Sequence, residues 1–216
     1  MIWPHYPYAQ KAGTWQVPAL LLGRFSVNCC INYDMKKFFP FISVLLLMSA
    51  GQAPPGLFEV RKGKIEFHSS AKLELIKAES DALKGLVDLG RKQFAFKVAL
   101  NSFKGFNSPL QQEHFNENYL ETETYPDASF SGKIIEDDDL SKDGTYTIRA
   151  KGNLSIHGVI QERIIRSTVQ VSQGKMKLQS SFTVLLSDHD IKIPRIVSEK
   201  LSSEISVQIL AELEPK

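Results

Sequence analysis

Apolar side chains recur at every second position along most of the chain beyond residue 57, and this period limits the fold more than any other feature. In residues 145–157 (TYTIRAKGNLSIH), the even-numbered positions from Tyr146 to Ile156 are apolar or small, whereas the odd-numbered positions are polar. Alternation over a dozen residues predicts a long antiparallel strand with one buried face and one face in water. The same period predicts further strands at 93–100, 128–134, 175–186 and 204–213, and strands also fit 64–69, 83–89 and 161–172.

Turns and one helix separate these strands. The glycines within 142–145 (KDGT) and 172–175 (SQGK) predict hairpin turns with a positive φ at the glycine. Residues 108–120 depart from the period of two, with Ser108 as a candidate N-cap and Pro109 at the first helical position. We expect one helix there, and a shorter helical turn after Pro194.

About eight long strands with a single helix predict an all-β fold. The chain has no internal repeat and no second hydrophobic block that would indicate another domain. Strands of about ten residues would leave long unpaired edges in an open sheet, and closure removes those edges completely. The sequence therefore predicts a single closed antiparallel barrel.

Residues 35–53 (MKKFFPFISVLLLMSAGQA) have the order of a secretory signal, namely two lysines, an uncharged apolar stretch and small residues. The apolar stretch from Phe38 to Ala50 is shorter than the roughly 20 residues of a membrane-spanning helix, so we expect no permanent membrane anchor. A signal at this position predicts that translation starts at Met35 and that residues 1–34 are not translated. Cleavage after Gly51 or Ala53 would leave a periplasmic or secreted protein that begins at residue 52 or 54 and contains the barrel domain, residues 54–216.

Composition narrows the function of residues 54–216. Removing residues 1–53, which hold four basic residues and one acidic residue, changes the net charge from +2 to −1, so no basic nucleic-acid surface is expected. Both cysteines, Cys29 and Cys30, also lie in the removed part. We therefore expect neither a disulfide framework nor a thiolate metal site in the exported domain.

Patterns typical of catalysis or metal binding are weak. Residues 136–144 (EDDDLSKDG) resemble half of a calcium loop, but the acid expected at the twelfth position is replaced by Ala150. Asp188, His189 and Asp190 are close together near a predicted strand end, where alternation would place His189 on the face opposite the two acids. No G-x-S-x-G elbow is present to carry a nucleophile. We expect no enzyme, no catalytic residue and no metal site, with a hydrolase built on the barrel as the alternative.

Three segments taken together carry a family resemblance. They are HFNENYLETETYPDASFSGKI (114–134), AKGNLSIHGVIQERIIRSTV (150–169) and FTVLLSDHDIKIPRIVSEKLSSEISVQILAEL (182–213). In this order they resemble the YceI-like family of exported, lipocalin-like proteins. The resemblance implies an eight-stranded barrel that carries a polyisoprenoid, an isoprenoid quinone or a fatty-acid-like amphiphile in an apolar pocket.

The candidate ligand-binding residues follow from the strand period and from this resemblance. The period places eight side chains inside the barrel, where the family's pocket would lie: Phe94, Phe96, Phe130, Tyr146, Ile148, Leu154, Phe182 and Val184. The resemblance places His114 and Tyr119 of the helix near the pocket entrance. We expect no cofactor, although a haem-type ligand on His114 is a second alternative. The oligomeric state stays open, a homodimer included.

Overall fold

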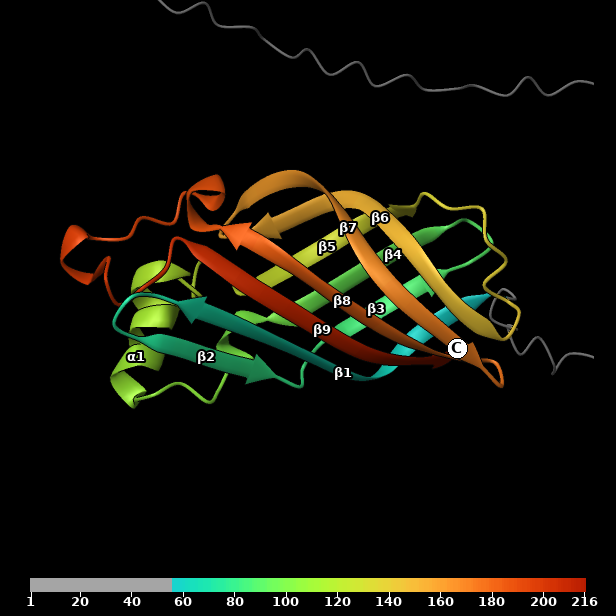
Figure 1. Cartoon of the computed structure of the whole chain (residues 1–216), viewed down its shortest axis with the longest axis horizontal. Helices are drawn as coiled ribbons and strands as arrows, with labels where there is room; N and C mark the ends of the chain where they lie inside the picture. Colours follow the sequence, from blue (N-terminus) through green and yellow to red (C-terminus); the bar gives the residue numbers. More distant parts are fainter. Residues whose placement is uncertain (1–55) are drawn as a thin grey trace, which may run out of the picture. The chain divides into compact units, whose positions relative to one another are not determined.

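Nine strands form one antiparallel sheet in the computed structural model, which describes residues 56–216 (Figure 1). The predicted signal segment and the predicted start at Met35 lie outside the described residues. The elements, in chain order, are β1 (Leu57–Ser70), β2 (Leu75–Ser80), β3 (Lys84–Asp88), β4 (Gln93–Ala99), the 3-10 turn η1 (Leu100–Ser102), α1 (Pro109–His114), the π-helical turn η2 (Phe115–Tyr119), β5 (Asp127–Ile134), β6 (Gly144–Ile156), β7 (Val159–Ser172), β8 (Lys175–Leu185), the 3-10 turns η3 (Leu186–His189) and η4 (Arg195–Val197), and β9 (Glu204–Pro215).

Eight of these strands close into a barrel. From β3 to β9 each strand pairs with the next one along the chain, and β1 then pairs with β9 on one side and with β3 on the other. The β1–β9 ladder runs along residues 58–69 of β1. This arrangement confirms the predicted closed antiparallel, lipocalin-like barrel.

The ninth strand, β2, was not predicted. It pairs with β1 at residues 65–70, on the same side of β1 as β3, so β2 and β3 follow one another along a single interrupted edge. Beyond this pairing, Glu79 forms an isolated bridge with Lys104. The hydroxyls of Ser80 and Ser102 are also hydrogen bonded, with oxygens 2.6 Å apart. The β2 strand therefore completes the barrel wall at one end, where the chain after β4 has left the sheet.

Side chains alternate across the barrel wall as the sequence predicts. In β6, the residues Ile148, Ala150, Gly152 and Leu154 are buried, whereas the residues between them are exposed or partly exposed. Strand β1 keeps this alternation through a bulge between Val60 and Lys62, which shifts the register by one residue. The inward side chains of the strands form the hydrophobic core.

Three helical elements, η1, α1 and η2, connect β4 to β5 at one end of the barrel, which we call the helix end (Figure 1). Residues 108–120, which contain α1 and η2, are called the helical segment. The hydroxyl of Ser108 accepts a hydrogen bond from the amide of Gln111 (3.2 Å), and Pro109 occupies the first turn, as predicted. The α-helix ends at His114 and continues as the π-helical turn η2. The predicted helical turn after Pro194 is η4. At the opposite end, called the distal end, lie the C-terminus and the β5–β6 loop.

The hairpin turns match the prediction only in part. Gly174 has a φ of 71° between β7 and β8, as predicted. The prediction for Gly144 was wrong, because this residue begins β6 and is absent from the glycines with positive φ. An unpredicted tight turn at His157 (φ 52°) and Gly158 (φ 73°) joins β6 to β7. A β-carbon on Gly158 would lie 2.5 Å from the Tyr125 ring, which explains why glycine stands there.

No helix among residues 56–216 is long and apolar enough to span a membrane.

Candidate ligand-binding cavity

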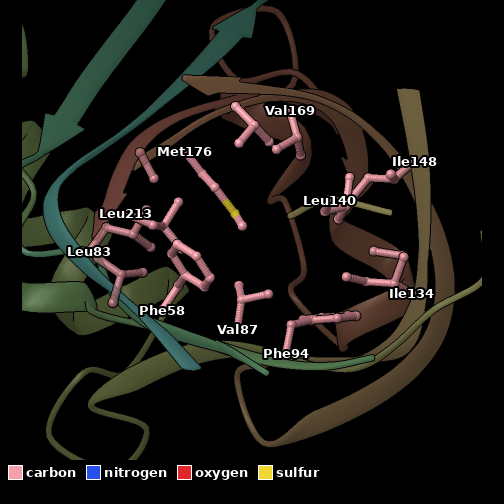
Figure 2. Close-up of a cluster of buried hydrophobic side chains, with 14 of the residues drawn as sticks. Phe58, Leu83, Val87, Phe94, Ile134, Leu140, Ile148, Val169, Met176 and Leu213 are labelled. Atoms are coloured by element: carbon pink, nitrogen blue, oxygen red, sulfur yellow. The ribbon is translucent and has the colours of Figure 1, made fainter. Parts of the chain in front are cut away.

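The distal half of the barrel encloses an apolar cavity, which we call the distal chamber. Inward side chains from strands all around the wall point toward its centre, as Figure 2 shows for Phe94, Ile148 and Val169. The free volume of this chamber, counted as the space open to the centre of a water molecule, is about 100 Å³. Leu140, in the β5–β6 loop, is buried and also lines the chamber, so this loop closes the distal end.

Four polar residues are part of this lining, and two of them, Ser167 and Ser180, are buried, whereas Lys97 and Ser129 are not. Ser167 of β7 donates a hydrogen bond to Ser180 of β8 (3.1 Å), and Ser180 in turn donates to the carbonyl of Arg166 (3.1 Å). Each of the two hydroxyls thus donates its hydrogen bond to another atom of the protein. The pair is satisfied internally and places no unpaired donor in the chamber.

A second cavity, the helix-side chamber, lies at the helix end and offers about 160 Å³ by the same measure. Its lining residues are all apolar or aromatic. They come from the barrel strands, from the helical segment (Phe115, Tyr119 and Leu120) and from the η3–β9 connection (Ile191 and Leu201). The helical segment and this connection therefore cover the helix end of the barrel.

The two chambers adjoin and share part of their lining, which we call the waist. Five residues line both of them: Ile65, Val98, Ala128, Leu154 and Phe182. From Ile148 in the distal chamber to Ile156 in the helix-side chamber, β6 spans about 26 Å, or about 20 Å along the axis of a barrel with normal strand tilt. Apolar side chains therefore line about 20 Å of the barrel axis across the two adjoining chambers.

Aromatic rings seal the wall where β4 has left the sheet. Phe67 of β1 stacks on Phe115 of η2 with ring centres 5.3 Å apart, and Phe103 and Phe106 pack around both rings. Ring pairs of this kind contribute about 0.5–1.5 kcal/mol each beyond the area that they bury. The helical segment is thus held to the barrel by aromatic packing.

Most of the residues predicted to bind a ligand face the two chambers. Those lining the distal chamber are Phe94, Phe96, Phe130, Ile148, Leu154 and Phe182, and those lining the helix-side chamber are Tyr119, Leu154, Phe182 and Val184. Their inward orientation agrees with the predicted register. Contact with a ligand stays a prediction for each of them.

Two of the predicted residues lie elsewhere. Tyr146 is half-buried, donates a hydrogen bond to the carbonyl of Lys142 (3.0 Å), and does not line either chamber. His114 is exposed at the end of α1, where its Nδ1 lies 2.8 Å from the side-chain nitrogen Nδ2 of Asn118. No histidine lines either chamber within residues 56–216, so the haem hypothesis loses the ligand on which it rested.

His189 is buried but does not line either chamber. Its ring is hydrogen bonded to a backbone carbonyl and not to a carboxylate. The residue lies in the 3-10 turn η3, so the strand alternation expected for Asp188, His189 and Asp190 was wrong. The Nδ1–H donates to the carbonyl of Val159 (3.3 Å), and Nε2 is buried without a hydrogen-bond partner. Burial lowers the pKa of His189, so the neutral ring is favoured.

The carboxylate of Asp188 is paired with Arg163 (3.4 Å) and forms no hydrogen bond or ion pair with the imidazole of His189. Within residues 56–216 no group of three histidine, cysteine or acidic side chains is placed to hold a metal ion. The geometry around His189 therefore lacks the base-and-acid pair of a hydrolase.

Sequence patterns missed several residues of the cavity. Leu140, Ile191 and Leu201 lie in irregular segments, where the period of two gives no signal. The only sequence signal that could have indicated them is the presence of single leucines or isoleucines within otherwise polar connections. The packing of the connections against the barrel ends decides their role.

Comparison with known proteins agrees with this architecture. A polyisoprenoid binding domain from Saccharophagus degradans, implicated in plant cell wall breakdown, has a similar structure (TM-score 0.61, 17% identity, 74% of this chain and 98% of that chain covered). Burkholderia cenocepacia BcnA is also similar (TM-score 0.59, 12% identity, 69% and 95% covered). At these identities the likeness shows the fold. No curated protein matches the sequence significantly.

The YceI-like domain model matches residues 54–213, which include the lining of both chambers and all barrel strands except the last two residues of β9. The chain therefore belongs to the YceI-like family.

Proposed function

We propose that residues 54–216 form an exported carrier that holds a long apolar ligand, such as a polyisoprenoid, an isoprenoid quinone or a fatty-acid-like amphiphile, inside the barrel. The observation that carries this proposal is the pair of adjoining chambers inside the barrel, which share five apolar lining residues. The similar Saccharophagus degradans structure is named as a polyisoprenoid binding domain, which supports the same ligand class. The signal pattern of residues 35–53 supports a periplasmic or secreted location.

The energetics of these chambers suit reversible carriage. Each methylene buried in the chambers contributes about 0.8 kcal/mol, so a tail of modest length binds usefully without a charged anchor. The serine pair is already satisfied and makes no demand on the ligand. We propose binding without catalysis, because no nucleophile with its base opens on either chamber among the described residues.

A direct test is to identify what co-purifies with the protein. Native mass spectrometry and organic extraction of freshly purified protein are expected to reveal an apolar chain with a long tail. After the ligand is stripped, uptake of ubiquinones with short and long isoprenoid tails, and of palmitate, measures the preference. A barrel that is empty from every host and takes up none of these molecules would contradict the proposal.

The shared waist allows a sharper test. Ala128 is half-buried and lines both chambers, so Ala128→Phe should obstruct the passage between them. Overfilling a packed interior costs about 1–3 kcal/mol, so we expect affinity for a long-tailed ubiquinone to fall roughly tenfold or more. A tail short enough to fit one chamber should lose much less. The measurement is a titration of the stripped protein with both quinones.

Ser131→Phe is the matched control, because Ser131 lies three residues further along β5 on the exposed outer face. This variant should bind both quinones like the unmodified protein. Equal affinities of the Ala128→Phe and Ser131→Phe variants for the long-tailed quinone would mean that the ligand does not pass the waist.

A further inference from the structure

The two most exposed large apolar side chains of the described residues lie at the helix end. Ile196, in η4, is 91% exposed, and Leu73, in the β1–β2 turn, is 68% exposed. Neither position is explained by packing within the barrel. Single exposed apolar residues are ordinary, but a group of them on neighbouring loops indicates an interaction surface.

These two loops are in direct contact. The amide of Leu73 donates a hydrogen bond to the carbonyl of Glu199 (2.9 Å), and the ammonium group of Lys72 lies 3.6 Å from the carboxylate of Glu199. In Figure 1 the η3–β9 connection extends beyond the barrel at the same end as α1 and the β1–β2 turn. We call residues 71–74 and 192–200 together the rim surface.

Charge on the rim surface is unbalanced around Ile196. Lys192, Arg195 and Lys200 are exposed, and none of them forms an ion pair with any residue of the described part of the chain. Glu199, the acid nearest to Ile196 in sequence, is already paired with Lys72. An exposed isoleucine flanked by three uncompensated cations fits a partner that is apolar beneath and negative at its surface.

The second acid of the rim surface is engaged elsewhere. The carboxylate of Glu74 accepts hydrogen bonds from the side-chain amides of Asn107 (3.2 Å) and Gln111 (2.8 Å) at the start of the helical segment. These bonds hold the Glu74 carboxylate toward α1. Both acids of the rim surface therefore have protein partners, whereas its three unpaired cations remain available to a negatively charged partner.

We propose that the rim surface docks reversibly on an anionic lipid bilayer, with Ile196 and Leu73 entering the interface and the three cations contacting lipid headgroups. Each basic residue close to an anionic surface strengthens binding by roughly fivefold, and burial of an isoleucine adds a comparable or larger factor. The docking is peripheral and needs no spanning segment. It is also independent of what the barrel carries.

The same connection links the rim surface to the cavity. Ile191 and Leu201 flank the rim residues of this connection and line the helix-side chamber. Docking would therefore bring the η3–β9 connection, which covers that chamber, against the bilayer. A ligand that crosses this cover would pass between bilayer and barrel with little exposure to water.

The test is co-sedimentation of the full chain with vesicles of phosphatidylcholine alone and of phosphatidylcholine mixed with phosphatidylglycerol. We expect binding to the anionic vesicles that weakens with salt, and little binding to the neutral ones. Ile196→Ser and the triple variant K192Q/R195Q/K200Q should each reduce binding about tenfold or more. The apolar stretch in residues 35–53 is common to all variants, so differences between them report on the rim surface.

Ile164→Ser is the matched control, because Ile164 is 60% exposed on the outer face of β7. It should bind vesicles like the unmodified chain, and ligand uptake in solution should be unchanged in the Ile196→Ser variant. Hydrogen exchange with anionic vesicles should show added protection at residues 71–74 and 192–200. Equal vesicle binding of the Ile196→Ser and Ile164→Ser variants would overturn the proposal, as would protection confined to other segments.

A separate outcome would point to a protein partner. If the chain ignores pure lipid vesicles but binds vesicles that carry native membrane proteins, in an Ile196-dependent manner, the lipid proposal is overturned. Loss of ligand uptake with vesicle binding intact would contradict only the carrier function.

Discussion

At the scale of single residues, His189 is the one titratable side chain that is buried among residues 56–216. It is 1% exposed, and its ring holds the η3 turn against the first residue of β7 through the Val159 carbonyl. The carbonyl of His189 accepts a second bond, from Nδ1 of His157 in the β6–β7 turn (3.1 Å). One residue thus ties the η3–β9 connection to the barrel, beside the helix-side chamber.

This environment predicts a pH dependence of stability. Burial lowers the pKa of His189 below its usual value of about 6.5, although the hydrogen bond to the Val159 carbonyl and the charge of Asp188 oppose this decrease. The unfolded chain therefore binds the proton more readily than the native protein. The contribution of the neutral ring to stability is complete above about pH 6.5 and is lost as the pH falls toward the lowered native pKa.

Urea unfolding between pH 5 and pH 8, values that bracket the ordinary pKa of about 6.5, measures this effect. In the His189→Gln variant the free energy of unfolding should change less with pH in the upper part of this range. The His114→Gln variant, changed at an exposed helical position, should keep the pH dependence of the unmodified protein. An unchanged slope in the His189→Gln variant would assign the dependence to other groups.

At the scale of elements, the helical segment is short and relies on its cap and its aromatic packing. Only six residues are α-helical before the π-helical turn, too few for a stable isolated helix. The Ser108 cap and the hydrogen bond from the Gln111 side-chain amide to Glu74 hold the first turn of this segment. Phe115 holds its second half against Phe67. The segment therefore forms because the barrel and the β1–β2 turn provide its contacts.

Ser108→Ala tests this dependence. Loss of the cap should cost about 0.5–2 kcal/mol, concentrated in the helical segment. Amide exchange of residues 109–119 should become faster, while the exchange of β6 and β7 stays slow. Ser131→Ala, on the exposed face of β5, is the control and should change neither. Uniform acceleration over all strands in the Ser108→Ala variant would show that the helical segment and barrel unfold as one unit.

At the scale of the whole molecule, barrel closure leaves free volume that a ligand can fill. The two chambers together leave room for several water-sized spheres, and apolar walls give such water few partners. A ligand that binds only the folded barrel stabilises it by about 2.7 kcal/mol at a hundredfold excess over Kd. The stripped protein should therefore be the less stable form.

Thermal unfolding of stripped protein at increasing ubiquinone concentration measures this stabilisation. We expect Tm to rise continuously, by about 2–4 °C for each kcal/mol of binding energy in a domain of this size. The Ala128→Phe variant should show a smaller rise with the long-tailed quinone. A Tm independent of quinone concentration would contradict binding to the native barrel.

The sequence by itself determined the strands, their inward faces, the capped helix and the barrel class, because alternation and capping are local properties of a few neighbouring residues. The inward orientation of Ile148 and Leu154 and the cap on Ser108 could be predicted in this way. Sequence did not predict β2, and it placed Tyr146 in the pocket although the side chain lies outside both chambers. Only the tertiary structure decided the free volume, the waist at Ala128 and the packing of Leu140 and His189, because these depend on how side chains from many strands and loops meet in space.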